Sequence, residues 1–388
     1  MAPPLKKVIG FWLLVPGLFI YLAYRLPGDT GRLCYAQTGR NVRVLIFRDL
    51  GSLSLKVNGQ YETFDAATDK IIGRGKNLHT TVTVYGGGIL LGNTRCNTHK
   101  LLIRTDPSRS ITINGRELRG DIKLIKDNNK LLVVNFIGLE DYVKGVSIRE
   151  TSHYWPFESL KAQVIVFRTF ALYKMQESGG KDFDLTSDVY SQVYGGVAAE
   201  RFRINKAVDQ TQGLALVYKG KILPAFYHAT CAGHTAASST VWNIDIEPLR
   251  GVSCPFCAES PHFKWHAVMN LAEAAKALTK AGHKISGIKE ISILGRDHSG
   301  RVTDLKIKGD KKEMKILAKD FRNILGPNIV KSTNFELKTA NGDMILEGFG
   351  WGHGIGLCQW GAYFMAKLGK TYKQILEYYY PGSGISRI

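Results

Sequence analysis

The chain has 388 residues, 44% of them hydrophobic and 22% charged, which is enough apolar material for one large or two ordinary domains and excludes an intrinsically disordered chain. Lysine and arginine number 52 against 33 aspartate and glutamate. The formal charge of +19 indicates either an acidic partner, such as nucleic acid, anionic lipid or a cell-wall polymer, or simply a solvated basic surface. No helix-turn-helix, basic heptad or aromatic ribonucleoprotein pattern accompanies the charge, so we expect no nucleic acid and favour the wall or a membrane.

The N-terminal segment predicts a membrane anchor. Lys6 and Lys7 precede an uncharged apolar run at residues 8–24, which is about the minimum length that spans a bilayer. The positive flank predicts a single-pass protein with its N-terminus in the cytoplasm and its bulk exported. A cleavable signal peptide is the alternative, but no small-x-small cleavage site follows the run.

Residues 31–134, which follow the anchor and linker at residues 1–30, predict antiparallel sheet. Short apolar stretches alternate there with turn signals, as at Val42 to Phe47 and Leu131 to Phe136. The pairs Asn58-Gly59 and Asn114-Gly115 suit type I′ hairpin turns. This third of the chain is therefore expected to be β-rich.

The pattern changes at Leu139, where apolar residues begin to recur at helical spacing as far as about Glu150. After a loop, Pro156 suits the first turn of a second helix, which Gly179-Gly180 ends. Glu150 is therefore expected at the junction between two helices.

The remainder, within the region 135–388, predicts mixed structure. In chain order we expect short strands to about residue 224, a loop region with cysteines and histidines at 227–266, a helix at 271–279, strands through 346, a glycine-rich turn at 348–356, and helices at 359–368 and 372–380. Strands and helices do not alternate strictly. This predicts an α+β fold of antiparallel sheets with packed helices rather than a doubly wound parallel sheet.

Three motifs stand out along the second half of the chain. The first comprises Asp141-Tyr142-Val143-Lys144-Gly145-Val146, Glu150, Trp155-Pro156 and Arg168-Thr169-Phe170-Ala171. The second is Ser191-Gln192-Val193-Tyr194-Gly195-Gly196. The third is Gly350-Trp351-Gly352-His353-Gly354-Ile355-Gly356, followed by Gln359-Trp360-Gly361-Ala362 and Tyr379-Tyr380-Pro381-Gly382. In this order they resemble the stage II sporulation protein D (SpoIID) family, whose members include lytic transglycosylases and amidase-enhancer proteins, over roughly residues 135–388.

The resemblance implies cleavage of the bond between N-acetylmuramic acid and N-acetylglucosamine in peptide-stripped peptidoglycan, leaving a 1,6-anhydro end. It places Glu150 at the family's catalytic glutamate. One carboxyl group suffices, because it first protonates the leaving oxygen and then accepts the proton of the sugar's own C6 hydroxyl, whereas hydrolases usually need two. Glu158 and Asp188 are the nearest candidates for a second carboxylate, which this reaction does not require.

The predicted anchor places the protein at the bacterial cytoplasmic membrane, and the division septum or an engulfment site is a candidate location. The alternative function is a non-catalytic wall-binding protein that recruits or enhances a peptidoglycan amidase. Such a binding module would have no need of the acid at Glu150.

Stripped glycan carries a free lactyl carboxylate on each disaccharide, which suits a basic chain. Arg168 is a candidate clamp for that carboxylate, with a structural salt bridge as the alternative. Further candidates for sugar contacts, with a place in the core as the alternative for the aromatic rings, are Gln163, Gln192, Tyr194, Trp351, His353 and Gln359.

Cys231-x-x-His234 followed by Cys254-x-x-Cys257 predicts a structural tetrahedral zinc site. A disulfide is the alternative in an exported protein, and a zinc hydrolase would need a ligand position left open. Cys358 with His353 could form a nucleophile pair, but the family's mechanism uses none. The glycosidic chemistry itself requires no cofactor.

Overall fold

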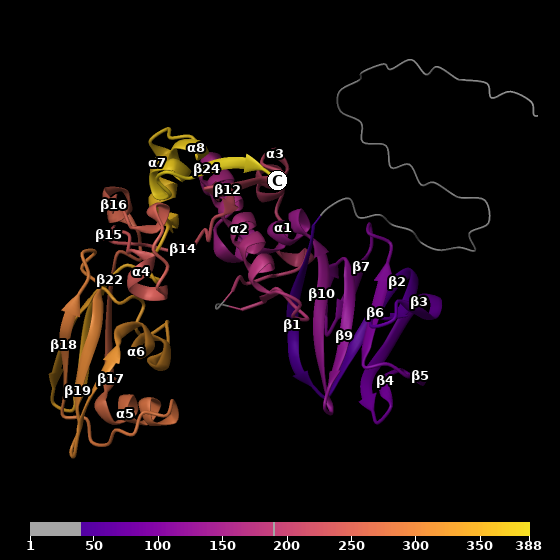
Figure 1. Ribbon diagram of the computed structural model, residues 1–388, viewed down its shortest axis with the longest axis horizontal. Helices are drawn as coiled ribbons and strands as arrows, with labels where there is room; N and C mark the ends of the chain where they lie inside the picture. Colours follow the sequence, from indigo (N-terminus) through magenta and orange to yellow (C-terminus); the bar gives the residue numbers. More distant parts are fainter. Residues whose placement is uncertain (1–39, 189–190) are drawn as a thin grey trace, which may run out of the picture. The chain divides into compact units, whose positions relative to one another are not determined.

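A computed structural model describes residues 40–188 and 191–388, and its fold is α+β, with antiparallel sheets and packed helices as predicted (Figure 1). The expected anchor at residues 8–24 lies outside the described residues. Among the residues that are described, no helix is both long and apolar enough to cross a membrane.

The N-terminal part of the chain forms one large sheet, coloured indigo to purple in Figure 1. Its strands are β1 (Asn41–Leu50), β2 (Ser52–Asp65), β3 (Lys70–Tyr85), β4 (Gly88–Leu91), β5 (Thr94–Cys96), β6 (Lys100–Thr105), β7 (Ser110–Ile113), β8 (Arg116–Arg119), β9 (Asp121–Asp127), β10 (Lys130–Gly138) and the short β11 (Leu185–Thr186). The main order is β11-β1-β10-β9-β6-β2-β3-β4-β5, and the β7–β8 hairpin pairs with β2. All these pairings are antiparallel except that of β1 with β11.

The two Asn-Gly pairs behave differently. Asn114 and Gly115 both have positive φ, at 48° and 80°, and they close the β7–β8 hairpin as predicted. The turn predicted at Asn58-Gly59 is wrong, because this pair lies inside β2, at a register shift between Val57 and Gln60. The Gly59 N–H donates to the Asn77 side chain of the neighbouring strand at 2.8 Å, so the dipeptide forms a bulge instead of a turn.

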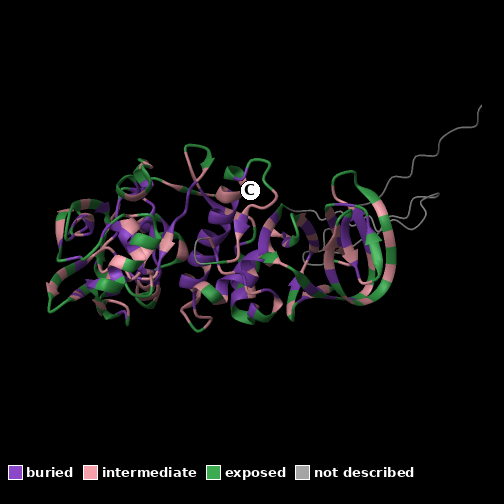
Figure 2. Ribbon diagram, turned by 90° about the horizontal axis from the view of Figure 1, so that it is seen from below, coloured by how far each residue is buried: buried purple, intermediate pink, exposed green. Residues whose placement is uncertain are grey.

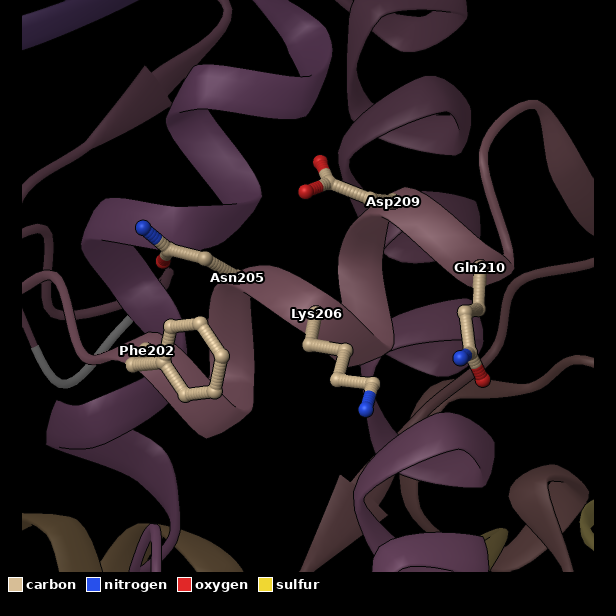
Figure 3. Close-up of a pocket in the computed structure, with 5 residues that line it drawn as sticks. All are labelled: Phe202, Asn205, Lys206, Asp209 and Gln210. Carbon is tan, nitrogen blue, oxygen red and sulfur yellow. The ribbon is translucent and has the colours of Figure 1, made fainter. Parts of the chain in front are cut away.

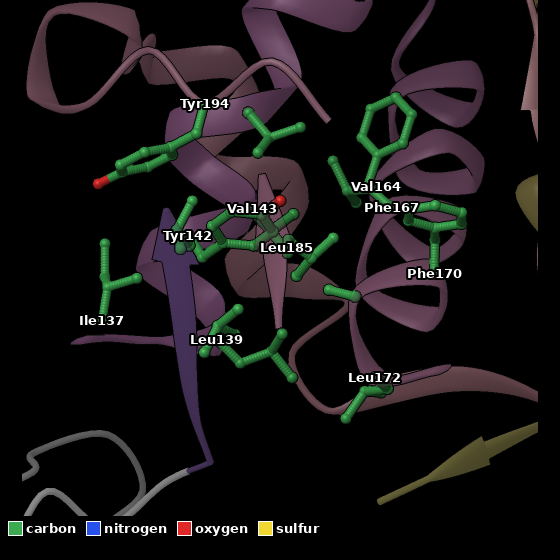
Figure 4. Packing of buried hydrophobic residues seen from close by; sticks show 14 of the residues in the cluster. Ile137, Leu139, Tyr142, Val143, Val164, Phe167, Phe170, Leu172, Leu185 and Tyr194 are labelled. Atoms are coloured by element: carbon green, nitrogen blue, oxygen red, sulfur yellow. The ribbon is translucent and has the colours of Figure 1, made fainter. Parts of the chain in front are cut away.

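The predicted pair of helices follows the sheet as α1 (Leu139–Glu150) and α2 (Phe157–Glu177). Their buried faces share one core, in which Figure 4 shows Tyr142 and Val143 of α1 near Val164 and Phe167 of α2. Helix α3 (Phe202–Gln210), which was not predicted, packs against both.

A buried ion pair joins α1 to α2. Arg168 has no exposed surface, and its guanidinium donates to Glu140 through Nε at 3.0 Å and through Nη2 at 2.7 Å. Its Nη1 donates to the carbonyl of Leu214 at 3.0 Å, in the first residue of β12 (Leu214–Tyr218). One side chain thus fixes three elements relative to one another.

Short strands and helices complete this part of the chain. They are β13 (Lys221–Ile222), β14 (Tyr227–His228), β15 (Gly233–His234), α4 (Ser238–Trp242), β16 (Ser253–Cys254), β23 (Leu357–Cys358), α7 (Gln359–Lys367), α8 (Tyr372–Tyr379) and β24 (Gly384–Arg387), with 3-10 turns at Val197–Ala199, Glu247–Leu249 and Pro255–Glu259. Strand β14 pairs in parallel with β23, which brings segments about 130 residues apart in the chain side by side.

Residues 264–349 have a hydrophobic core of their own. This region contains two three-stranded antiparallel sheets and two helices, namely β17 (Lys264–Asn270), α5 (Leu271–Lys280), β18 (Glu290–Arg296), β19 (Val302–Lys308), β20 (Glu313–Leu317), α6 (Ala318–Leu325), β21 (Phe335–Ala340) and β22 (Asp343–Phe349). Buried residues recur between exposed ones along these elements (Figure 2), as amphipathic elements around a core require.

The Arg168–Glu140 pair gives a first prediction. Glu140→Gln would leave the buried guanidinium without its counter-charge, so we expect a loss of about 3 kcal/mol in the free energy of unfolding. Urea unfolding of the purified protein measures this loss. The matched control is Asp245→Asn in the exposed pair with Arg250, which should cost under about 1 kcal/mol. Equal effects of the two substitutions would contradict the structural role of Arg168.

Candidate active site

Glu150 is the last residue of α1, and its side chain is partly buried. The backbone N–H of Val193 donates to Glu150 Oε1 at 3.0 Å, and the Tyr227 hydroxyl also hydrogen-bonds to the carboxyl. Three segments that are distant in the chain therefore meet at this one carboxyl group.

A hydrogen-bonded chain orients Tyr227. Gln192 is fully buried, accepts from the Tyr142 hydroxyl at 3.0 Å and donates through Nε2 to the Tyr227 oxygen at 3.3 Å. Because the Tyr227 oxygen accepts this bond, its own proton is available to Glu150. Gln192, predicted to contact sugar, is instead buried and connected to the Glu150 carboxyl through Tyr227.

A second chain holds the backbone at Glu150. Gln359, at the start of α7, donates through Nε2 to the Glu150 carbonyl at 2.8 Å and to Gln163 Oε1 at 3.2 Å. Gln163 is fully buried and in turn donates to Ser159 Oγ at 3.0 Å. Both glutamines lie at the site, where they position the end of α1 against α2 and α7.

Burial raises the pKa of the Glu150 carboxyl, and the hydrogen bonds from Val193 and Tyr227 offset part of that rise. Burial also raises the pKa of Tyr227, so this residue stays a hydrogen-bond donor. Glu150 is the C-terminal residue of α1, where the helix dipole is negative and favours the neutral acid.

The two candidates for a second carboxylate are engaged elsewhere. Glu158 accepts from Lys161 Nζ and from the backbone N–H of Tyr372, both at 2.8 Å. Asp188 is exposed and accepts from the Thr186 hydroxyl at 2.9 Å. Neither acts on the pKa of Glu150.

The clamp expected of Arg168 is not what the structure shows. Its side chain is fully buried, and its hydrogen bonds go to Glu140 and to residues of the same core, so the structural salt bridge is the alternative that holds. Tyr194 is also buried, at 2% exposure, and its ring stacks on Tyr142 at 5.5 Å between centroids. Arg168 and Tyr194 therefore pack in the core beneath the site and are not available to contact a sugar.

Partly exposed aromatic rings lie around α7, beside Gln359. Trp155, from the loop after Glu150, packs against Trp360 at 5.0 Å between ring centroids. Trp351 contacts His262 at 4.8 Å, and the Lys331 ammonium lies 4.8 Å from the Trp351 ring centroid. Such rings can offer apolar faces to a sugar.

His353 faces inward. Its Nδ1 accepts from the Ile355 N–H at 3.0 Å, and its ring packs 4.8 Å from that of Trp242. Burial and the neighbouring His228 lower the pKa of His353, so its imidazole is neutral. Within the described chain no hydrogen bond joins His353 to Cys358, which removes the basis for a Cys–His nucleophile pair.

Four buried cysteines form a second group of candidate functional residues. The sulfur atoms of Cys231, Cys254, Cys257 and Cys358 all lie within 4.8 Å of one another, and each of these cysteines is a free thiol. The predicted ligand His234 is wrong, because its Nδ1 bonds to the neighbouring carbonyl of Thr235 at 2.7 Å and it lies outside the group. Pairing of β14 with β23 brings Cys358 into the fourth position.

The cluster fits a tetrahedral metal. Zinc–sulfur bonds of about 2.3 Å place neighbouring sulfurs about 3.8 Å apart, and Cys231 Sγ lies 3.5 Å from Cys257 Sγ. The fully buried Arg301 guanidinium donates to the carbonyls of Cys231 and His234 at 2.9 and 3.0 Å, and it makes no ion pair with an acid in the described chain. A buried cation needs nearby negative charge, of which Asp297 supplies a part and four thiolates around a divalent metal would supply more.

The pocket drawn in Figure 3 is unrelated to these groups. It is lined by Phe202, Asn205, Lys206, Asp209 and Gln210, all on α3. None of them belongs to the predicted site, so Glu150 with its hydrogen-bonded partners remains the candidate active site.

Comparisons with known proteins give matches both to the region around Glu150 and to the region after the first cysteines. The family model described as Stage II sporulation protein matches residues 127–218, which include Glu150, and a domain of unknown function (DUF8618) matches residues 256–356. An uncharacterized protein of Brachyspira hyodysenteriae is 34% identical over 354 residues, 90% of this chain and 94% of that protein.

Two relatives carry descriptive names. Stage II sporulation protein D of Bacillus subtilis is 34% identical over 270 residues, which cover 65% of this chain and 76% of the relative. The protein named amidase enhancer of Bacillus subtilis is 28% identical over 289 residues, which cover 63% of this chain but only 40% of that longer protein.

The raised pKa of Glu150 predicts a pH dependence of stability. The neutral carboxyl contributes stability that is complete below the unfolded pKa and is lost as the pH rises through the folded pKa. Relative to Glu150→Gln, which stays neutral, the wild type should therefore become less stable from about pH 4 towards neutrality. The loss should be about 1.4 kcal/mol for each pH unit that separates the unfolded from the folded pKa. Urea unfolding of both proteins across this pH range measures the difference.

Glu158 provides the matched control with the opposite sign. Burial raises its pKa, but the bonds from Lys161 and the Tyr372 N–H outweigh burial and hold the pKa below its ordinary value. Relative to Glu158→Gln, the wild type should gain stability as the pH rises through the unfolded pKa. Curves of the same sign for both glutamates would contradict the burial assigned to Glu150.

Proposed function

Because the chain belongs to the stage II sporulation protein D family, we propose that it is a lytic transglycosylase acting on peptidoglycan glycan strands, with Glu150 as its catalytic acid. The observation that carries the proposal is a single carboxyl whose pKa is raised by burial and which accepts hydrogen bonds from Val193 and Tyr227. A raised pKa favours the protonated form of the acid, which is the form that a proton donor needs.

The reaction needs only this one group. Glu150 protonates the glycosidic oxygen as the bond to C1 of N-acetylmuramic acid breaks, and the sugar acquires oxocarbenium character. The resulting carboxylate then takes the proton of the C6 hydroxyl as that oxygen attacks C1, which leaves a 1,6-anhydro end and regenerates the acid. No water is consumed. The Val193 N–H and the Tyr227 hydroxyl would stabilise the carboxylate between the two steps.

The cell wall would be the partner and the membrane the location. The charge of +19 suits strands whose stem peptides have been removed, since each then carries a free lactyl carboxylate. The apolar run at residues 8–24 would hold the protein in the bacterial cytoplasmic membrane with its bulk outside, and the division septum is a candidate position.

A second function draws support from the relative named amidase enhancer. In that case the protein would bind the wall and stimulate a peptidoglycan amidase without cleaving glycan. The hydrogen-bonded and buried acid at Glu150 favours the enzyme, because binding alone gives no reason to bury a carboxyl group.

The four cysteines would hold a structural zinc ion. Their geometry offers four sulfur ligands, which completes a tetrahedral site and leaves no position for substrate or water. The ion would fasten the 3-10 turn at Pro255–Glu259 to the start of α7, and so support the Gln359 contact at Glu150. It would take no part in the glycosidic chemistry.

The transglycosylase predicts a specific product. We expect residues 31–388 to release fragments from peptide-stripped strands that are one water lighter than hydrolysis products, and we expect Glu150→Gln to reduce this release by at least about a thousandfold. Mass spectrometry of the fragments measures it. Glu158→Gln is the matched control and should keep near-normal activity, since that carboxylate is paired with Lys161. Strand binding or amidase stimulation without any anhydro product would support the second function instead.

The zinc site predicts bound metal in the purified protein. Metal analysis should find about one zinc per chain, and Cys254→Ser should remove it with a loss of several kcal/mol in stability. Cys96→Ser is the control, because Cys96 is equally buried and free but lies outside the cluster. A Cys254–Cys257 disulfide in metal-free protein would overturn the zinc proposal.

A further inference from the structure

Two arginines lie beside the segment that contacts Glu150. Arg149 precedes Glu150 on α1, and Arg116 is the first residue of β8. The Arg116 guanidinium lies 5.6 Å from the ring centroid of Tyr194, and Arg149 Nε lies 3.0 Å from the point where a Cβ on Gly195 would stand. These contacts are one and two residues from Val193, whose N–H binds the Glu150 carboxyl.

Neither arginine has an acidic partner within residues 40–188 and 191–388. Arg116 donates to Ser187 Oγ at 3.0 Å, and that hydroxyl donates to the Tyr194 carbonyl. Arg119, three residues further along, is by contrast paired with Glu200 at 2.6 Å. Burial lowers the pKa of Arg116, and the charge of Arg149 lowers it further, so the two guanidinium groups repel one another.

The partly buried Arg116 and the exposed Arg149, neither with a counter-charge in the described chain, form a site for an anion, since a bound carboxylate relieves their repulsion and accepts two hydrogen bonds from a guanidinium. The Gly195 backbone leaves room for Arg149, because a side chain there would meet both Arg149 and Ala199. The same short segment, Val193 to Gly195, thus contacts both the candidate acid and Arg149.

We propose that Arg116 and Arg149 bind the lactyl carboxylate of muramic acid and so select glycan whose stem peptides have been removed. The inference rests on the proposed glycan substrate. The lactyl group is attached to C3 of the same ring whose C1 Glu150 would act upon, so a cation close to the acid is where the chemistry requires it. When a stem peptide is present, this carboxylate is an amide and carries no charge.

The test compares two polymers. Peptide-stripped strands carry the lactyl carboxylate, and strands in which it has been reduced to the alcohol do not. Binding is measured by co-sedimentation or titration with the Glu150→Gln protein, so that cleavage does not interfere. The protein should bind the charged strands at least about tenfold more tightly, as expected for one charged hydrogen bond. Adding Arg149→Gln, or Arg149→Gln with Arg116→Gln, should abolish that preference and leave binding of reduced strands unchanged.

Arg109→Gln is the matched control, because it removes the same charge from an exposed arginine. Arg109 precedes Ser110 at the open end of the β7–β8 hairpin, whereas Arg116 lies at its turn. It should keep the preference. Equal loss of binding to both polymers, or a preference that survives in the double variant, would overturn the inference. Fragments released by the wild type are scored separately. A preference for charged strands without any anhydro product would support the arginine site and contradict the transglycosylase. Anhydro product without that preference would support the transglycosylase and contradict the arginine site.

Discussion

The fixed position of α1 depends on the buried guanidinium of Arg168. Its hydrogen bonds reach Glu140 at the start of α1 and Leu214 at the start of β12. Because a helix is a rigid rod, fixing its first turn to α2 also restricts where Glu150 stands at its last residue. The contacts of Gln359 with the Glu150 carbonyl and with Gln163 then fix the other end. The acid is held by its backbone as well as by its carboxyl.

Local pattern was enough to predict the elements that flank the site. The spacing after Leu139 and the position of Pro156 predicted α1 and α2, and therefore the junction at Glu150. Helices α3 and α6 were missed, although Ala318, Phe321 and Leu325 of α6 are buried at helical spacing, because each is a short amphipathic segment among strands. The sequence also showed no sign that Tyr227 would reach Glu150, since Tyr227 is positioned by pairing of β14 with a strand about 130 residues away.

The cysteine cluster, too, could be predicted only in part from the sequence. Motif spacing identified Cys231, Cys254 and Cys257, but it favoured His234 because that residue is close in sequence. The fourth sulfur comes from Cys358, which also accepts the Gly361 N–H at the start of α7. Arg301 comes from the separately packed region 264–349 and donates to the Cys231 carbonyl. The cluster is therefore the point where that region, α7 and the loop after β14 are fastened together.

A carboxyl that must stay protonated and cations that must bind a carboxylate have conflicting needs, because a nearby cation lowers the pKa of an acid. Glu150 and Arg149 are adjacent in sequence, yet Arg149 has no influence on the pKa of Glu150. Successive side chains of a helix point in different directions, so the two groups do not face each other. The segment from Val193 to Gly195 contacts them separately, through a backbone N–H at the acid and through a bare glycine at the cation. Proton donation and anion binding can thus occur side by side on one helix end.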